Sequence, residues 1–295
     1  MSAGRPSFTI VGLGEVGCVF ARGLLRQMVE LRVASLPTPQ AESAAAELGL
    51  PLFADAAMAV SGADLVLLTV TGESLVTVAR AIGPALLPGA LVADLTSAAP
   101  RDVEAAAQAV PAEAYVDVAI MGAVSLHGIA TPMLASGAAA PAFAQIMNPL
   151  GFNVSARVGS VIGDASRLKL LRSIFAKGLD AVVAEAMLAA EALGLRADLT
   201  AQLEDFDRSP LRDHIAMYLR THPVHATRRL VEMEQAEKEL VALGLPSLTT
   251  RAAIERYRRT ADFTRESALP PGPLDADRAL AWLLDAERAS VKDLS

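Results

Sequence analysis

Residues 7–17 read SFTIVGLGEVG, an apolar run that leads directly into three closely spaced glycines, Gly12, Gly14 and Gly17. The apolar run is typical of a buried β-strand, and helix-like sequence that includes Phe20 follows the glycines at once. Gly12 suits a tight turn, Gly14 lets a bound group approach the backbone, and Gly17 lets helix and strand pack closely. The stretch therefore predicts a strand, a tight turn and a helix.

The pattern repeats along the first half of the chain. Apolar runs predict further strands at 31–34, 65–70, 91–94 and 115–120, and alanine-rich segments predict helices at 40–47, 73–81 and 100–109. Uninterrupted apolar runs are typical of strands that are covered on both faces of a parallel sheet. This alternation predicts an α/β Rossmann-type fold with a doubly wound parallel sheet.

The second half of the chain has a different texture. Strand signals almost disappear after about residue 160, where Asp164 can cap a long helix running to about 193. Later helices are expected from about 226 and around 280. We therefore expect a Rossmann-type domain over 1–162 and an all-α domain over 163–295.

Composition and charge exclude several functions. The 295 residues carry a formal net charge of −7, which argues against nucleic-acid binding because that needs a basic surface. Cys18 is the single cysteine, so no internal disulfide is possible, and we expect no metal site. No apolar run is long enough to span a membrane and no signal peptide is visible. We expect a cytoplasmic protein without a membrane partner.

The glycine pattern between strand and helix predicts binding of a nicotinamide dinucleotide. NAD-specific domains usually end the second strand with an acid, but the sequence at 33–38 is VASLPT. The carboxylate is missing here, and the hydroxyl groups of Ser35 and Thr38 could donate hydrogen bonds to a 2′-phosphate, which favours NADP. No arginine follows the strand, so NAD stays possible. The expected cofactor contacts are Gly12, Leu13, Gly14, Glu15, Val16, Gly17, Ser35, Thr38, Thr69 and Val70.

Several motifs together resemble the β-hydroxyacid dehydrogenase superfamily, to which 6-phosphogluconate dehydrogenase belongs. Besides the glycine motif they are DLTSAAP at 94–100, YVDVAIMGAV at 115–124 and GDASRLKLLRS at 163–173. The later segments RSIFAKGLDAVVAE (172–185) and HATRRLVEMEQAEKEL (225–240) are similar to a branch with a DUF1932-type C-terminal domain.

This resemblance implies that Lys169 is the catalytic residue and that Ser97 lies near the nicotinamide. Hydride transfer to or from a carbinol carbon leaves a proton to be moved on the oxygen, and a partly desolvated lysine can act as that general acid or base. The dehydrogenase would act on CH–OH groups of a small polar hydroxy compound.

The expected substrate contacts follow from the same motifs. Arg172 and Ser173 lie three and four residues beyond Lys169 and so share its helix face. Met121 stands where the family has a serine, which suggests a more apolar pocket. Ala176 stands where the decarboxylating phosphogluconate enzyme has an acidic residue, which argues against that reaction. The full expected set is Met121, Gly122, Ala123, Arg172, Ser173 and Lys177.

Histidines offer further candidates. His127 is expected to make a structural hydrogen bond, and His214, with Asp213 beside it, lacks the spacing of a metal-binding pair. A basic cluster could bind a substrate anion, or it could form surface ion pairs with Glu232 and Glu234. The cluster consists of His222, His225, Arg228 and Arg229.

Two rival functions stay open at this point. Imine reductases resemble this architecture but generally lack the lysine, so Lys169 favours C–O chemistry. A protein that senses NADPH without catalysing a reaction is the second alternative. The resemblance also implies a homodimer, because related enzymes pair through the helical half.

Overall fold

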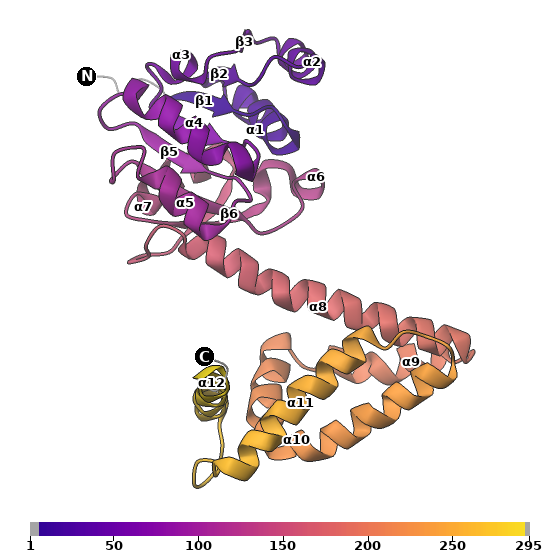
Figure 1. The fold of residues 1–295 in the computed structure, drawn as a ribbon. Helices are drawn as coiled ribbons and strands as arrows, with labels where there is room; N and C mark the ends of the chain where they lie inside the picture. The colour runs from indigo at the N-terminus through magenta and orange to yellow at the C-terminus, as the bar shows by residue number, and fades with distance from the viewer. Residues whose placement is uncertain (1–5, 293–295) are drawn as a thin grey trace. The chain divides into compact units, whose positions relative to one another are not determined.

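The computed structural model describes residues 6–292 (Figure 1). The chain forms two compact units, Met1–Ile174 and Phe175–Ser295, and the division falls within the long helix α8 (Asp164–Ala192). The domain boundary at 162/163 stays a prediction.

The N-terminal unit is built on an eight-stranded sheet of order β3-β2-β1-β4-β5-β6-β7-β8. All neighbouring strands run parallel except β6 and β7, which are antiparallel. Strand order reverses between β1 and β4, which is the usual place for a ligand in such sheets. The strands are β1 (Ser7–Val11), β2 (Glu30–Ala34), β3 (Leu52–Phe53), β4 (Leu65–Leu68), β5 (Leu91–Asp94), β6 (Tyr115–Ile120), β7 (Pro132–Ser136) and β8 (Asn153–Ala156).

Helices cover both faces of this sheet. One buried cluster joins α1, α2 and α7 to the sheet through side chains such as Phe20 and Phe143, and the other joins α3, α4 and α5 through side chains such as Leu75 and Val103. In Figure 1, α4 and α5 lie side by side over one face. The helices are α1 (Glu15–Arg26), α2 (Pro39–Leu48), α3 (Ala56–Val60), α4 (Leu75–Ile82), α5 (Pro100–Ala107), α6 (Val124–His127) and α7 (Ala140–Met147).

The described residues of the C-terminal unit form helices joined by turns and loops, without a strand. After α8, Gly194 has a φ of 71°, as expected for a left-handed residue that ends a helix. α11 and α12 both pack against α10. The helices beyond α8 are α9 (Arg196–Gln202), α10 (Leu211–Ala242), α11 (Leu248–Glu266) and α12 (Ala276–Lys292).

The predicted fold class is confirmed, with local differences. The predicted strands at 91–94 and 115–120 have the observed bounds, whereas the run at 65–70 ends as a strand at Leu68. β7 and β8 were not predicted. α10 begins at Leu211 rather than near 226. Pro223 lies inside this helix and is buried there, so the proline does not interrupt it. Asp164 is the first residue of α8, and side chains from the sheet bind the amides that follow it.

Candidate active site

A cavity of about 620 Å³ lies at the carboxyl ends of β1, β2 and β4, where the strand order reverses. Several predicted cofactor residues line it, whereas Glu15, Val16, Gly17 and Ser97 do not. Further lining residues that sequence reasoning missed include Leu36, Thr71, Glu73 and Thr77. The predicted residues in the lining are Gly12, Leu13, Gly14, Ser35, Thr38, Thr69 and Val70.

The glycine turn has the geometry that a dinucleotide needs. Gly12 has a φ of 107°, which favours glycine, and its N–H donates to the Ala34 carbonyl at 2.7 Å. A Cβ placed on Gly14 would meet no described atom within 4 Å, so the backbone there is open to a ligand. These features fit a pyrophosphate at the start of α1.

Two predicted cofactor residues also hold the cavity wall together. Thr69 donates its hydroxyl hydrogen to the Gly12 carbonyl at 2.6 Å, which fixes the glycine turn against β4. The Thr38 hydroxyl accepts the Ala41 N–H at 3.2 Å and caps α2. Their side chains therefore shape the cavity in addition to lining it.

Lys169 and Ser97 are joined directly, although 72 residues separate them. The Lys169 ammonium on α8 donates to the Ser97 hydroxyl, just past β5, at 2.8 Å. Lys169 is half-buried. The loop of Ser97 packs on Gly72, since a Cβ there would lie 3.3 Å from the Ser97 carbonyl oxygen. Gly72 stands between two cavity-lining residues, Thr71 and Glu73, so the Lys169–Ser97 pair lies next to the cavity wall.

Two buried aspartates lie close to this pair in the sheet, and sequence reasoning did not single them out. Asp94 and Asp117 are each 1% exposed and are register partners on the adjacent strands β5 and β6. Tyr115 donates to Asp94 at 2.6 Å, and burial raises the pKa of the Asp94 carboxyl above its usual value. The signal was present, because an acid within an apolar strand is unusual and needs hydrogen-bond partners.

The predicted substrate residues are spread over several segments. Met121, Gly122 and Ala123 follow β6, where the Met121 N–H donates to the Pro132 carbonyl at 2.8 Å. On α8, Ser173 is half-buried and Arg172 is exposed.

Lys177 lies in the C-terminal unit, on the part of α8 beyond Ile174, and is exposed. The substrate role of these residues stays a prediction.

Members of the histidine and arginine cluster have different partners. Arg228 makes an exposed ion pair with Glu232 at 3.3 Å, as the surface interpretation predicts. His222 instead bonds the Thr260 hydroxyl at 3.0 Å and stacks on Tyr257.

Structural bonds also account for His214, which bonds the Phe206 carbonyl at 3.1 Å. Among the described residues, no group of three or more His, Cys, Asp and Glu side chains could hold a metal ion. No helix in residues 6–292 is both long and apolar enough to cross a membrane.

Comparison with known protein families finds one match in each half of the chain. Residues 7–98 match the family described as NADP oxidoreductase, coenzyme F420-dependent, and residues 190–260 match the domain of unknown function DUF1932. The first match agrees with the expected NADP cofactor and the second with the expected C-terminal domain.

Two solved structures are similar to this chain over most of its length. A conserved hypothetical protein from Sinorhizobium meliloti is 30% identical, with 91% of this chain and 92% of that chain covered and a TM-score of 0.60. A conserved protein of unknown function, reported as structurally similar to 3-hydroxyacid dehydrogenases, is 28% identical over 87% of this chain and 97% of that chain, with a TM-score of 0.61.

The fold also extends to more distant enzymes. An imine reductase from Myxococcus stipitatus in complex with NADP+ is 18% identical over 95% of this chain and 100% of that chain, with a TM-score of 0.71. The chain thus belongs to the β-hydroxyacid dehydrogenase-like superfamily of NADP-dependent oxidoreductases, in a branch that carries a DUF1932 domain.

Proposed function

We propose that this protein transfers a hydride between NADP, or NAD, and the carbinol or carbonyl carbon of a small polar hydroxy compound, with Lys169 as general acid or base. The hydrogen bond of 2.8 Å between Lys169 and Ser97, next to the dinucleotide cavity, carries the proposal. The bound nicotinamide supplies or accepts the hydride. The residues of the chain then have to hold the cofactor and move one proton.

The amides of the Gly12–Gly14 turn and the N-terminus of α1 would hold the pyrophosphate. Ser35 and Thr38, at the far side of the same cavity, would bind the ribose end. Lys169 would give its proton to the carbonyl oxygen during reduction and take it back during oxidation. Ser97 would orient the ammonium through the hydrogen bond that it accepts.

Imine reduction is the second candidate. It is supported by the fold shared with imine reductases and by the apolar Met121 in place of the family's serine. Imine reductases generally lack the lysine, so imine reduction should not depend on Lys169, and the response to loss of Lys169 separates the two reactions.

The test is turnover of a substrate panel by the wild type and by Lys169→Met. Hydroxy acids, sugar acids, amino alcohols and cyclic imines are mixed with NADP(H) or NAD(H), and the absorbance of the reduced nicotinamide is followed. We expect Lys169→Met to lower kcat on a hydroxy compound by about 10²–10⁴-fold, the usual contribution of general acid–base catalysis.

Lys238→Met is the matched control, because Lys238 is an exposed lysine on helix α10. It should retain wild-type turnover. Turnover of an alcohol that survives in Lys169→Met would contradict the proposed role. Turnover of imines alone would favour the second candidate, and tight NADPH binding without any turnover would favour a sensor.

We also propose a homodimer. Large apolar side chains of α8 are exposed in the single chain, with Ile174 at 72% and Leu188 at 62%. Exposed apolar surface of this kind commonly marks a protein interface. Light scattering coupled to gel filtration should give twice the chain mass, and a monomer at micromolar concentration would contradict this.

A further inference from the structure

Asp117 lies in the middle of β6 and is 1% exposed, yet it carries a carboxylate. Burying such a group is costly unless hydrogen bonds replace its water. Here they do, because one oxygen, Oδ1, accepts the Ser166 hydroxyl at 2.7 Å and the other, Oδ2, accepts the Ser136 hydroxyl at 2.9 Å and the Ser166 N–H at 3.1 Å.

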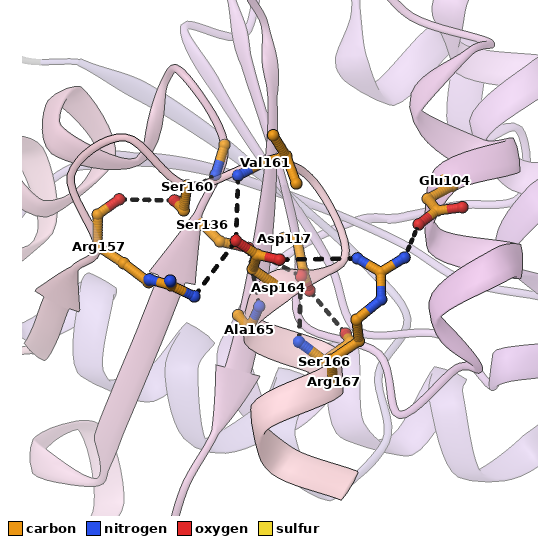
Figure 2. Close-up of polar contacts among 11 residues, drawn as sticks. Glu104, Asp117, Ser136, Arg157, Ser160, Val161, Asp164, Ala165, Ser166 and Arg167 are labelled. Atoms are coloured by element: carbon orange, nitrogen blue, oxygen red, sulfur yellow. Dashed lines mark hydrogen bonds and ion pairs between the residues drawn. The ribbon is translucent and has the colours of Figure 1, made fainter. Parts of the chain in front are cut away.

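These bonds reach the first turn of α8 from two strands (Figure 2). Ser136, on β7, passes the contact on, because its hydroxyl oxygen accepts the Ala165 N–H at 2.9 Å. The amides of Ala165 and Ser166 belong to the group that a helix leaves unpaired at its N-terminus. A carboxylate at this position is also favoured by the helix dipole.

The outer side of the same turn is held more weakly. Arg167 forms an ion pair with Glu104 on α5, and Asp164 accepts a bond from Arg157 at 3.3 Å (Figure 2). The Arg167, Glu104 and Arg157 side chains are all at least 40% exposed, and exposed ion pairs contribute little. The anchor with the greater effect is therefore the buried one at Asp117.

The anchor and the Lys169–Ser97 pair are linked through short, rigid segments. Lys169 lies three residues beyond Ser166 on the same helix. On the neighbouring strand, Asp94 accepts the Thr96 N–H at 2.9 Å and so shapes the loop that carries Ser97. Because Asp94 and Asp117 are register partners, the two members of the pair extend from adjacent points of one sheet.

We propose that Asp117 is a positioning residue that fixes the first turn of α8 on the sheet and thereby holds the Lys169 ammonium at Ser97. This inference rests on the proposed function of Lys169. Its direct consequence is a lysine with restricted reactivity, and that consequence can be measured without any substrate.

The test is competitive acetylation of the folded protein, with the reactivity of Lys169 measured by mass spectrometry relative to exposed Lys238. In the wild type, Lys169 should react more slowly than Lys238. Asp117→Asn keeps the shape of the side chain but places an NH₂ group against the N–H and hydroxyl donors of Ser136 and Ser166. The relative reactivity of Lys169 should then rise by about tenfold, as expected for the loss of a hydrogen bond to a charged group. With a turned-over substrate, kcat should fall by about 10²-fold while NADPH affinity stays unchanged, because a small misplacement has that effect.

Asp64→Asn is the matched control. Asp64 also accepts bonds from a serine N–H and hydroxyl on a neighbouring strand, those of Ser7 at 2.8 and 2.9 Å, but it is exposed and lies just before the amino end of β4. It should leave the reactivity of Lys169 unchanged. If Asp117→Asn does not fold, the double variant Ser136→Ala/Ser166→Ala keeps the carboxylate and removes three bonds, those of the two hydroxyls to Asp117 and that of the Ala165 N–H to Ser136.

Unchanged Lys169 reactivity in a folded Asp117 variant or in the double serine variant would overturn the inference. A merely structural role would lower the melting temperature without changing the ratio of Lys169 to Lys238. If the ratio changes but Lys169→Met keeps its turnover, the positioning role stands and the proposed catalytic function fails.

Discussion

Gly17 and Gly12 touch so closely that a Cβ on Gly17 would lie 2.0 Å from the Gly12 carbonyl oxygen. No real Cβ tolerates this distance, and the opposing atom is backbone. Gly17 thus serves the packing of α1 on the first turn, while Gly14, two residues from Gly12, faces open space. Two glycines of one motif therefore have separable roles.

Gly17→Ala should lower the free energy of unfolding by about 1–3 kcal/mol, the usual cost of an overpacked position. Gly14→Ala should change it by less than about 0.5 kcal/mol. Its methyl group would instead occupy the approach to the cofactor and weaken NADPH binding. Urea unfolding and titration of nicotinamide fluorescence measure the two effects, and the reverse pattern would refute the assignment.

Cofactor preference should respond to an acid at the end of β2. No lysine or arginine occurs among the described residues that line the cavity, so nothing there compensates an added negative charge. Ser35→Asp should weaken NADPH binding by on the order of 100-fold, because juxtaposed like charges are costly, and should spare or improve NADH binding.

Ser74→Asp controls for the added charge itself. Ser74 lines the same cavity but follows β4 rather than β2. Ser74→Asp should leave the ratio of NADPH to NADH affinity near the wild-type value. A ratio that changes equally in both variants would show that Ser35 does not lie nearer than Ser74 to the cofactor's 2′-phosphate.

Stability of the C-terminal unit should depend on His222. Burial and the neighbouring Arg256 and Arg229 guanidinium groups lower the pKa of His222 from about 6.5 to about 4. Between about pH 4 and pH 6.5, the unfolded chain therefore binds a proton at His222 that the folded chain does not bind. The stabilisation is complete above pH 6.5 and is lost as pH falls toward 4.

His222→Gln keeps a donor for Thr260 but does not titrate. The free energy of unfolding of the variant should fall less than that of the wild type between pH 6.5 and pH 4 in urea titrations. His127→Gln, at an exposed histidine, should follow the wild-type curve. Parallel curves for wild type and His222→Gln would contradict the prediction.

Glu185 should stabilise α11 from its neighbour α8. Burial alone would raise the pKa of Glu185, but bonds from the Thr250 hydroxyl and the Thr249 and Thr250 amides outweigh it and lower the pKa to about 2. This stabilisation is present above pH 4.5 and is lost as pH falls toward 2.

Glu185→Ala leaves the first amides of α11 without this acceptor, so it should lower stability at pH 7 by about 1 kcal/mol, as for a lost helix cap. Glu191→Ala, on the same helix but in an exposed ion pair with Arg196, is the control and should change stability by much less. Thermal unfolding of both variants decides the prediction.

Local patterns predicted most of the N-terminal unit. The strands at 91–94 and 115–120 and the glycine turn depend on apolar runs and on backbone freedom, both of which are properties of neighbouring residues. Strand β7 escaped prediction because Pro132 and Ser136 interrupt its pattern. The early start of α10 was missed because Pro223 is accommodated by packing that only the folded unit supplies.

The fold class and the dinucleotide turn could be predicted from spacing along the chain and from motif order, and the family motif singled out Lys169 as a candidate. Tertiary contacts were needed to show that Lys169 bonds Ser97 and that Asp117 accepts bonds from the first turn of α8. Those contacts join residues 72 and 49 positions apart, and a hydrogen bond depends on distances in space that no local pattern encodes.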